Sequence, residues 1–420
     1  MGTRRRVGNM QDTHPELFRD EALALPKSPT ETQVIGPPPG YGVLPSQHIH
    51  HLIQTKIIAS LREIQPGQIQ PASLDLRLGA EAYRVRASFL PGSRVPLAKQ
   101  LRHLQLDKFS LKGGAVLERG SVYVVQLQEA VKLPRSISAV ANPKSSTGRL
   151  DVFVRLISEN SEIFDYVEPG YAGNLYAEIS PRSFSIKVRE GSRLNQIRFR
   201  QLSRRHEKYR SYHLTDGQLQ ALHEKSRLVE GKPTIRNGLN IRVNLIGNAK
   251  SRIVGWRAKR YSAIVDVDEV NRYRASEFWD PISPPQGGRL MLDPLEFYIL
   301  ASRESLHIPP SFAAEMVPID PAMGEFRVHY AGFFDPGFGH AAAGGEGSKG
   351  VLEVRSHEVP FFLEDGQIVA RLVYEPLVAP PQLLYGENPG SNYQSQALKL
   401  SKHFYTTSLE RRRQRVVADK

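Results

Sequence analysis

Short apolar runs separated by Gly and Pro dominate the middle of this chain. Residues 121–127 (SVYVVQL) and 296–302 (EFYILAS) are rich in β-branched and aromatic side chains, and 173–180 (GNLYAEIS) alternates apolar and polar positions. Runs of this length are typical of β-strands, and the Gly and Pro clusters between them are typical of turns. The pattern predicts an all-β protein built of barrels or sandwiches.

The pattern also repeats along the chain. Residues 117–143 align without a gap on residues 292–318, and Glu129 falls on Glu304, so each matched pair is 175 residues apart (292 − 117 and 318 − 143). Agreement over so many turn and core positions indicates a tandem duplication. We call the two halves copy one and copy two.

Between the copies, Leu219, Leu222 and Val229 have helical spacing, and Gly231 is expected to end that helix. The predicted organisation is a flexible N-terminal tail, copy one, a helical linker, copy two and a C-terminal tail. These segments span residues 1–40, 41–205, 206–237, 238–382 and 383–420.

The composition limits the kinds of protein that this chain can be. No apolar run approaches the roughly 18–20 residues of a membrane helix, and the start carries no secretory signal, so we expect a soluble, cytoplasmic protein without membrane contact. The chain has 0 Cys, which excludes disulfides, thiol nucleophiles and Cys-based zinc sites. The net charge of +13 suits nucleic acid or small phosphorylated ligands. Because no aromatic stripe accompanies the basic residues, we expect no nucleic-acid partner.

One stretch, residues 142–152 (NPKSSTGRLDV), gathers three hydroxyls and two cations after a predicted strand. Such a turn could cradle an anion or could be an ordinary polar turn.

With the stretches 69–79 (IQPASLDLRLG), 167–179 (VEPGYAGNLYAEI) and 191–199 (GSRLNQIRF), this turn resembles, in order, the motifs of the dCTP deaminase and dUTPase superfamily. The similarity is greatest to the long, duplicated bacterial dCTP deaminases. It implies dUTPase-like jelly-roll or β-barrel domains, a trimer-like homo-oligomer with sites between domains, and zinc-independent hydrolysis of dCTP to dUTP and ammonia.

The resemblance implies three catalytic residues in copy one. Glu178 matches the family's catalytic Glu, which would carry protons between water, the base and the leaving amine. Ser145 would hold the catalytic water, and Arg149 would steady the polar end of the base.

Five further residues of copy one are expected to bind the nucleotide. Lys144, where the family usually has Arg, and Ser146 would contact phosphates. Tyr171 would pack against the sugar, and Glu168 stands where the family has an Asp that contacts the 3′-hydroxyl. Gln196 matches a Gln on the closing strand. Magnesium is expected only with the triphosphate, and no metal bound by the protein alone.

Copy two departs from this pattern. At the 175-residue offset the hydroxyls and the cation of the turn become Asp320, Pro321 and Gly324, although Glu353 corresponds to Glu178. Copy two is therefore expected to be catalytically inactive.

Residues 383–404 resemble the family's C-terminal segment, which folds over the triphosphate. Tyr385, Tyr393 and Gln396 fall on its matching positions, and this tail is expected to act as a hinged lid outside the folded cores. Alternative functions are a dUTP diphosphatase, a bifunctional enzyme that catalyses both steps, and a nucleotide-binding regulatory module without turnover.

Overall fold

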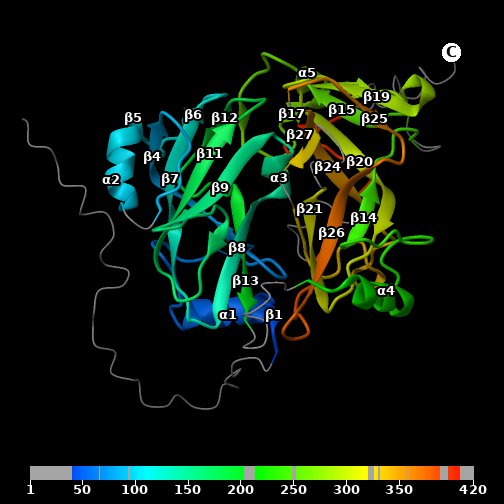
Figure 1. Cartoon of the computed structure of the whole chain (residues 1–420). Coiled ribbons are helices and arrows are strands. Elements are labelled where there is room, and N and C mark those ends of the chain that lie inside the picture. Colours follow the sequence, from blue (N-terminus) through cyan, green and yellow to red (C-terminus); the bar gives the residue numbers. More distant parts are fainter. Residues whose placement is uncertain are drawn as a thin grey trace, which may run out of the picture.

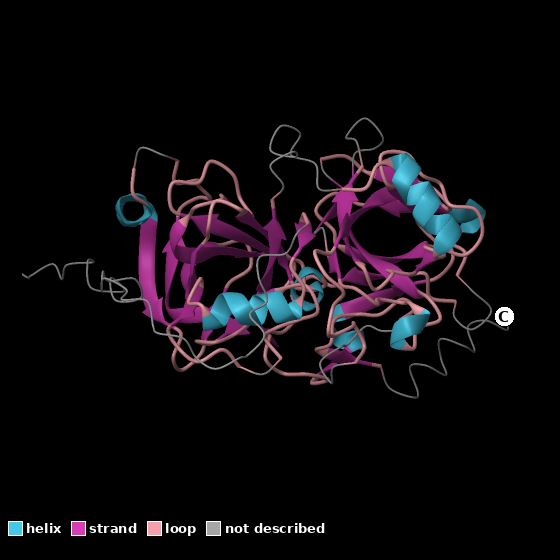
Figure 2. Cartoon of the chain, turned by 90° about the horizontal axis from the view of Figure 1, so that it is seen from below, coloured by secondary structure: helices cyan, strands magenta, loops and turns pink. Residues whose placement is uncertain are grey.

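The chain forms two β lobes that lie side by side, copy one in blue to green and copy two in green to orange (Figures 1 and 2). The computed structural model describes residues 40–65, 67–92, 95–202, 213–247, 252–319, 326–329, 332–356, 358–387 and 396–406.

Copy one contains two main sheets. One has the strand order β1-β13-β8-β10 with β3 paired to β13, and the other has the order β5-β4-β7-β11-β9 with β2 paired to β7. Its elements are β1 (Gly42–Val43), α1 (Ser46–Gln54), β2 (Ile58–Ser60), β3 (Leu74–Leu76), β4 (Leu78–Val85), α2 (Leu97–Leu104), β5 (Gln105–Ser110), β6 (Ala115–Leu117), β7 (Val122–Lys132), β8 (Ile137–Pro143), α3 (Ser145–Gly148), β9 (Val152–Ser158), β10 (Tyr166–Val167), β11 (Ala172–Pro181), β12 (Ile186–Val188) and β13 (Asn195–Gln201).

Copy two repeats this arrangement with the orders β14-β26-β21-β23 and β18-β15-β20-β24-β22. The orders match strand for strand except that β14 takes the place of β3 and β1 has no counterpart, and this agreement confirms the predicted all-β fold of two tandem domains. Its elements are β14 (Leu239–Arg242), β15 (Gly255–Ala258), β16 (Val265–Asp266), β17 (Tyr273–Arg274), α5 (Ala275–Phe278), β18 (Trp279–Ile282), the 3-10 turn η2 (Gln286–Gly288), β19 (Arg289–Leu292), β20 (Tyr298–Leu306), β21 (Phe312–Pro318), β22 (Phe326–His329), β23 (Phe333–Phe334), the 3-10 turn η4 (Ala341–Ala343), β24 (Ser348–Ser356), β25 (Phe361–Glu364), β26 (Ile368–Pro376) and β27 (Phe404–Tyr405).

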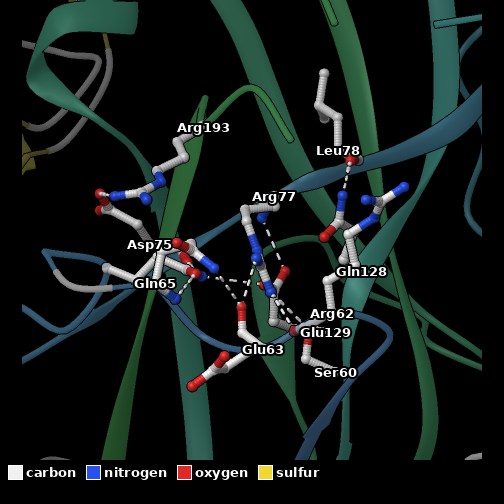
Figure 3. A network of polar contacts seen from close by, with 11 residues as sticks. Ser60, Arg62, Glu63, Gln65, Asp75, Arg77, Leu78, Gln128, Glu129 and Arg193 are labelled. Carbon is white, nitrogen blue, oxygen red and sulfur yellow. Dashed lines mark hydrogen bonds and ion pairs between the residues drawn. The ribbon is translucent and has the colours of Figure 1, made fainter. Parts of the chain in front are cut away.

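An Arg–Glu pair with a buried carboxylate occurs at the same place in both copies. In copy one, Glu129 on β7 accepts hydrogen bonds from the backbone N–H and the Nε of Arg77, both at 2.8 Å (Figure 3). In copy two, Glu304 accepts the same two bonds from Arg242 at 2.9 Å. Each carboxylate binds both the backbone and the side chain of its arginine. The pair therefore ties the segment around Arg77 to β7 in copy one, and the segment around Arg242 to β20 in copy two.

The two copies differ in what covers one face of the sheet with the order β5-β4-β7-β11-β9 in copy one and β18-β15-β20-β24-β22 in copy two. On copy one, α2 and its flanking residues cover this face with an apolar cluster that includes Tyr83, Leu101 and Val124. On copy two, the equivalent face packs on copy one, in a hydrophobic core continuous through both copies. Phe184 of copy one stacks edge-on against Trp279 of copy two at a centroid distance of 5.3 Å. This covering decides which Glu reaches the site described below.

The linker contains α4 (Asp216–Lys225), which begins with a capping box at Thr215 and buries Leu219. The predicted helix therefore exists, but it ends at Lys225 and not near Gly231, because Ser226 is already extended. No helix of the described residues has the length and apolar character needed to cross a membrane.

The described end of the C-terminal tail belongs to the core and not only to a lid. β27 pairs in parallel with β17, and Phe404 packs on Phe184 and Trp279 with 7% of its surface exposed. The expectation that the folded cores end before the tail is therefore corrected, because an aromatic side chain of the tail fills the seam between the copies.

Phe404→Ala should lower the free energy of unfolding by about 3–5 kcal/mol, since it leaves a cavity between the copies. Urea denaturation followed by fluorescence measures the change. Tyr405→Ala is the matched control, because Tyr405 is 39% exposed and should change stability little. Equal effects of the two substitutions would contradict the role of Phe404.

Candidate functional site

A cavity of about 490 Å³ lies where the two copies meet. Copy one contributes the turn after β8, copy two contributes β24 and the turn after β23, and the tail contributes its described part. Seven residues predicted for the site line this cavity: Lys144, Ser145, Ser146, Arg149, Gln196, Tyr385 and Gln396.

The wall from copy one is the short helical turn α3. Strand β8 ends at Pro143, and the carbonyl of Lys144 accepts the backbone N–H groups of Thr147 and Gly148 at 2.8 and 2.9 Å. This turn holds Ser145 at the cavity and buries Ser146. The Ser401 hydroxyl of the tail donates to the carbonyl of Ser146 at 2.7 Å, so the tail holds the turn from behind.

Arg149 follows this turn and is held by groups that come from outside copy one. Its Nη1 donates to the carbonyl of Lys399 at 2.9 Å, and its Nη2 donates to Oε1 of Gln396 at 3.1 Å. Its Nε lies 3.8 Å from Oε1 of Glu353 on β24. A guanidinium fixed in this way presents one edge to the cavity and to the carboxyl group of copy two.

Glu353 is a buried carboxyl group of the cavity with a raised pKa. Burial raises its pKa to about 8, and the neighbouring Arg149 guanidinium partly opposes that rise. A carboxyl with a pKa near neutrality can both accept and return a proton, which is the requirement for a general acid–base group.

The structure does not place Glu178 in the cavity, which corrects the prediction for this residue. Glu178 is 2% exposed, and its Oε1 accepts from Arg155 Nη2 at 2.6 Å and from Arg155 Nε at 3.1 Å. The Arg155 guanidinium in turn lies 4.0 Å from the Phe164 ring. Glu178 is thus committed to an ion pair beside the cluster under α2, whereas its counterpart in copy two, Glu353, lines the cavity.

The turn expected to contact the sugar lies at the cavity in copy two and not in copy one. Glu168 is exposed, and the Tyr171 hydroxyl donates to the carbonyl of Asn174 at 2.5 Å, so neither lines the cavity. Their counterparts Asp335 and Phe338 do line it. The sequence held this signal: copy two keeps Asp-Pro-Gly-Phe, whereas copy one has Glu where the family has Asp.

These two residues of copy two are well fixed. Asp335 Oδ1 lies 3.5 Å from Nη2 of Arg198, and burial raises the pKa of Asp335 against the opposing effect of that cation. The Phe338 ring packs on the Tyr385 ring at a centroid distance of 5.4 Å. The turn and the tail therefore form one wall with an aromatic surface.

One end of the cavity gathers charges of both signs. Lys144, Arg193 and Lys402 line it together with Asp75 and Asp268, and Lys144 pairs with the buried Asp75. Burial and the nearby Lys144 lower the pKa of Lys402. Gln196 accepts a hydrogen bond from Ser73 at 3.2 Å at the same wall. An anion at this end would be favoured by the cations around it.

Gln396 of the tail joins all three parts of the site. Its Nε2 donates to the carbonyl of Lys349 in copy two at 2.9 Å, while its Oε1 accepts from Arg149 in copy one. Tyr393, Asp320, Pro321 and Gly324 lie outside the described residues.

Comparison with known proteins agrees with this division into two copies. Residues 40–203 match the family model of the 2′-deoxycytidine 5′-triphosphate deaminase (DCD) N-terminal domain, and residues 215–404 match that of its C-terminal domain. A crystal structure of 2′-deoxycytidine 5′-triphosphate deaminase from Agrobacterium tumefaciens is 51% identical, with a TM-score of 0.76, and the match covers 80% of this chain and 99% of that one.

Single-copy relatives are also similar. The dUMP-forming dCTP deaminase of Sulfurihydrogenibium sp. is 30% identical over 37% of this chain and 84% of its own length. That of Persephonella marina is 29% identical over 37% of this chain and 82% of its own. The fold and the cavity define a protein of two tandem β domains with a cavity between its copies. The chain belongs to the dCTP deaminase family.

Glu353→Gln should make the protein relatively more stable at alkaline pH. Because the pKa of Glu353 is raised from 4.5 to about 8, the unfolded chain ionises first, and the wild type loses stability as the pH rises from 4.5 to about 8, where the buried carboxyl ionises too. The variant has no such group, so its melting temperature minus that of the wild type should increase between pH 6 and pH 9 in thermal scans. A constant difference would contradict the raised pKa.

Proposed function

We propose that this chain is an enzyme that hydrolyses dCTP to dUTP and ammonia in a composite site. The observation that carries the proposal is the meeting of Ser145 and Arg149 of copy one with Glu353 of copy two in one cavity. Membership of the dCTP deaminase family supports the same substrate.

In this reaction a water attacks C4 of cytosine and the bond from C4 to the exocyclic amine breaks. Glu353 takes a proton from the water and delivers it to ring N3. It then moves the proton of the new C4 hydroxyl to the leaving amine, so that C4 becomes a carbonyl, ammonia departs and the carboxylate ends in its starting state. Arg149 holds developing negative charge, and Ser145 orients the water. The buried site excludes other water from the intermediate.

The rest of the nucleotide would lie between the two walls. Asp335 accepts the 3′-hydroxyl, and the Phe338 ring crowds the C2′ position and so favours deoxyribose. Lys144, Ser146 and Lys402 face the triphosphate.

Magnesium would enter with the phosphates. Asp75 lines their end of the cavity, and its buried Oδ1 finds no hydrogen-bond donor among the described residues, so its carboxylate fits a hydrated Mg²⁺. The ion would neutralise part of the triphosphate charge.

A second candidate function is the coupled release of pyrophosphate to give dUMP, since the two single-copy relatives are named dUMP-forming enzymes. We expect ammonia and dUTP in equal amounts when purified protein is incubated with dCTP and Mg²⁺, as measured by anion-exchange chromatography. Ammonia accompanied by dUMP and pyrophosphate would establish the second candidate instead. An absence of ammonia would contradict both.

Glu353→Gln should lower turnover by about 10²–10⁴-fold, because an amide cannot carry the proton. Glu178→Gln is the matched control, since it changes the equivalent residue of copy one and should leave turnover within about threefold, with a loss of stability. Steady-state ammonia release for both variants provides the measurement. The reverse ranking would return the catalytic role to Glu178.

A further inference from the structure

A second charged pair crosses between the copies beside the catalytic pair. Arg355 Nε lies 3.1 Å from both carboxylate oxygens of Asp151, and Arg355 Nη2 also donates to this carboxylate. Asp151 is 0% exposed and Arg355 is 9% exposed. Each lies two residues after a member of the pair in the cavity, Asp151 after Arg149 and Arg355 after Glu353.

Each partner is held rigidly by its own copy. Asp151 has a φ of 57°, its N–H donates to the carbonyl of Gly148, and its Oδ2 accepts from the Ser183 hydroxyl at 2.7 Å. Arg355 Nη1 donates to the carbonyl of Leu295 at 2.7 Å. Because both side chains are held in place, the ion pair fixes the position of β24 relative to the turn of copy one that carries Asp151.

The two pairs have opposite polarity. Copy one offers the cation Arg149 to Glu353, while copy two offers the cation Arg355 to Asp151. Glu353 and Arg355 lie on the same face of β24, because side chains two apart in a strand point the same way. A slide of β24 by two residues would bring like charges together, which costs several kcal/mol at a desolvated interface. The crossed polarity therefore sets one register between the turn and the strand.

This device is not a general property of the repeated fold. The register of β11 in copy one and β24 in copy two matches Glu178 with Glu353 and Ser180 with Arg355. Copy one thus carries no cation two residues after its own Glu. The crossed pair occurs at the Glu that faces the cavity.

We propose that Asp151 and Arg355 are positioning residues, which hold Glu353 at its working distance from Arg149 without touching the nucleotide. Neither belongs to the described residues that line the cavity. The inference rests on the proposed function, because it assigns the pair an effect on deamination through Arg149 and Glu353.

Arg355→Lys tests this proposal, since it keeps the charge but loses the two-pronged contact. We expect the kcat for dCTP to fall by roughly 10–100-fold, as for a small misplacement of a reacting group. The KM should stay within about threefold. The limb of the pH–rate profile that reports Glu353 should move to higher pH, because the opposing Arg149 cation is held less closely.

Ser183→Ala is the milder variant, because it removes the hydroxyl that donates to Asp151 and accepts from Arg355 Nη2 at 3.3 Å, and it should move kcat and the pH limb in the same direction by less. Arg200→Lys is the control, because Arg200 forms another buried ion pair between the copies, 2.7 Å from Glu375, outside the cavity. It should lower the melting temperature and leave the pH limb unchanged. If Arg355→Lys and Ser183→Ala behave like this control, the pair is merely structural and the proposal is overturned.

A readout without substrate separates this proposal from the proposed function. Titration of ¹³C-labelled Glu side chains by NMR, with Glu353→Gln to assign the signal, should show the Glu353 titration moving to higher pH in Arg355→Lys. An enzyme that releases no ammonia but shows this shift would contradict the proposed function and support the positioning. An unmoved titration would overturn the positioning whatever the activity.

Discussion

The packing of the turn after β8 on strand β24 is the contact on which the rest of the structure depends. It buries Glu353 and Asp151, and the cations that face them, Arg149 and Arg355, each come from the other copy. A charge buried without its partner costs several kcal/mol, so separating the copies would leave both sides with unpaired groups or expose them to water. The aromatic seam around Phe184 supplies the apolar burial that favours docking. The residues that line the cavity are thus also residues of the interface between the copies.

Duplication allowed the two copies to divide the parts of one site. Copy one retains the hydroxyls and the cation of the turn at 144–149, whereas copy two retains the carboxyl Glu353 and the Asp335 turn. Since each half is used only where it faces the other, neither copy needs a full set. The tail then closes the arrangement, because Gln396 bonds to a residue of each copy. Because each copy supplies different residues to the cavity, the complete set forms only when the two copies pack together.

Much of the fold could be predicted from the sequence because it depends on local signals. Apolar runs and Gly or Pro turns define strands, and a constant offset of 175 residues reveals the duplication without any knowledge of packing. The turn at 144–149 was recognisable for the same reason, since its groups are adjacent in the chain. The carboxyl group was not, because Glu178 and Glu353 both lie in strand segments with an apolar residue on each side, YAEIS and VLEVR. Which one meets Arg149 depends on docking between segments about 200 residues apart, and local pattern does not encode it.

The two equivalent Glu residues have the same residue type but different surroundings, and the element packed over each one determines its contacts. Both lie on the same face of the same strand of the repeat, at matched register. Over copy one, α2 and its apolar cluster cover that face, and Arg155 lies close enough to neutralise Glu178 by a direct hydrogen bond. Over copy two, the covering element is copy one itself, which brings a cation at 3.8 Å and a cavity. At that longer distance burial prevails over the cation and raises the pKa of Glu353 to about 8. Arg155 at 2.6 Å thus holds Glu178 in an ion pair, whereas Arg149 at 3.8 Å leaves Glu353 at the cavity.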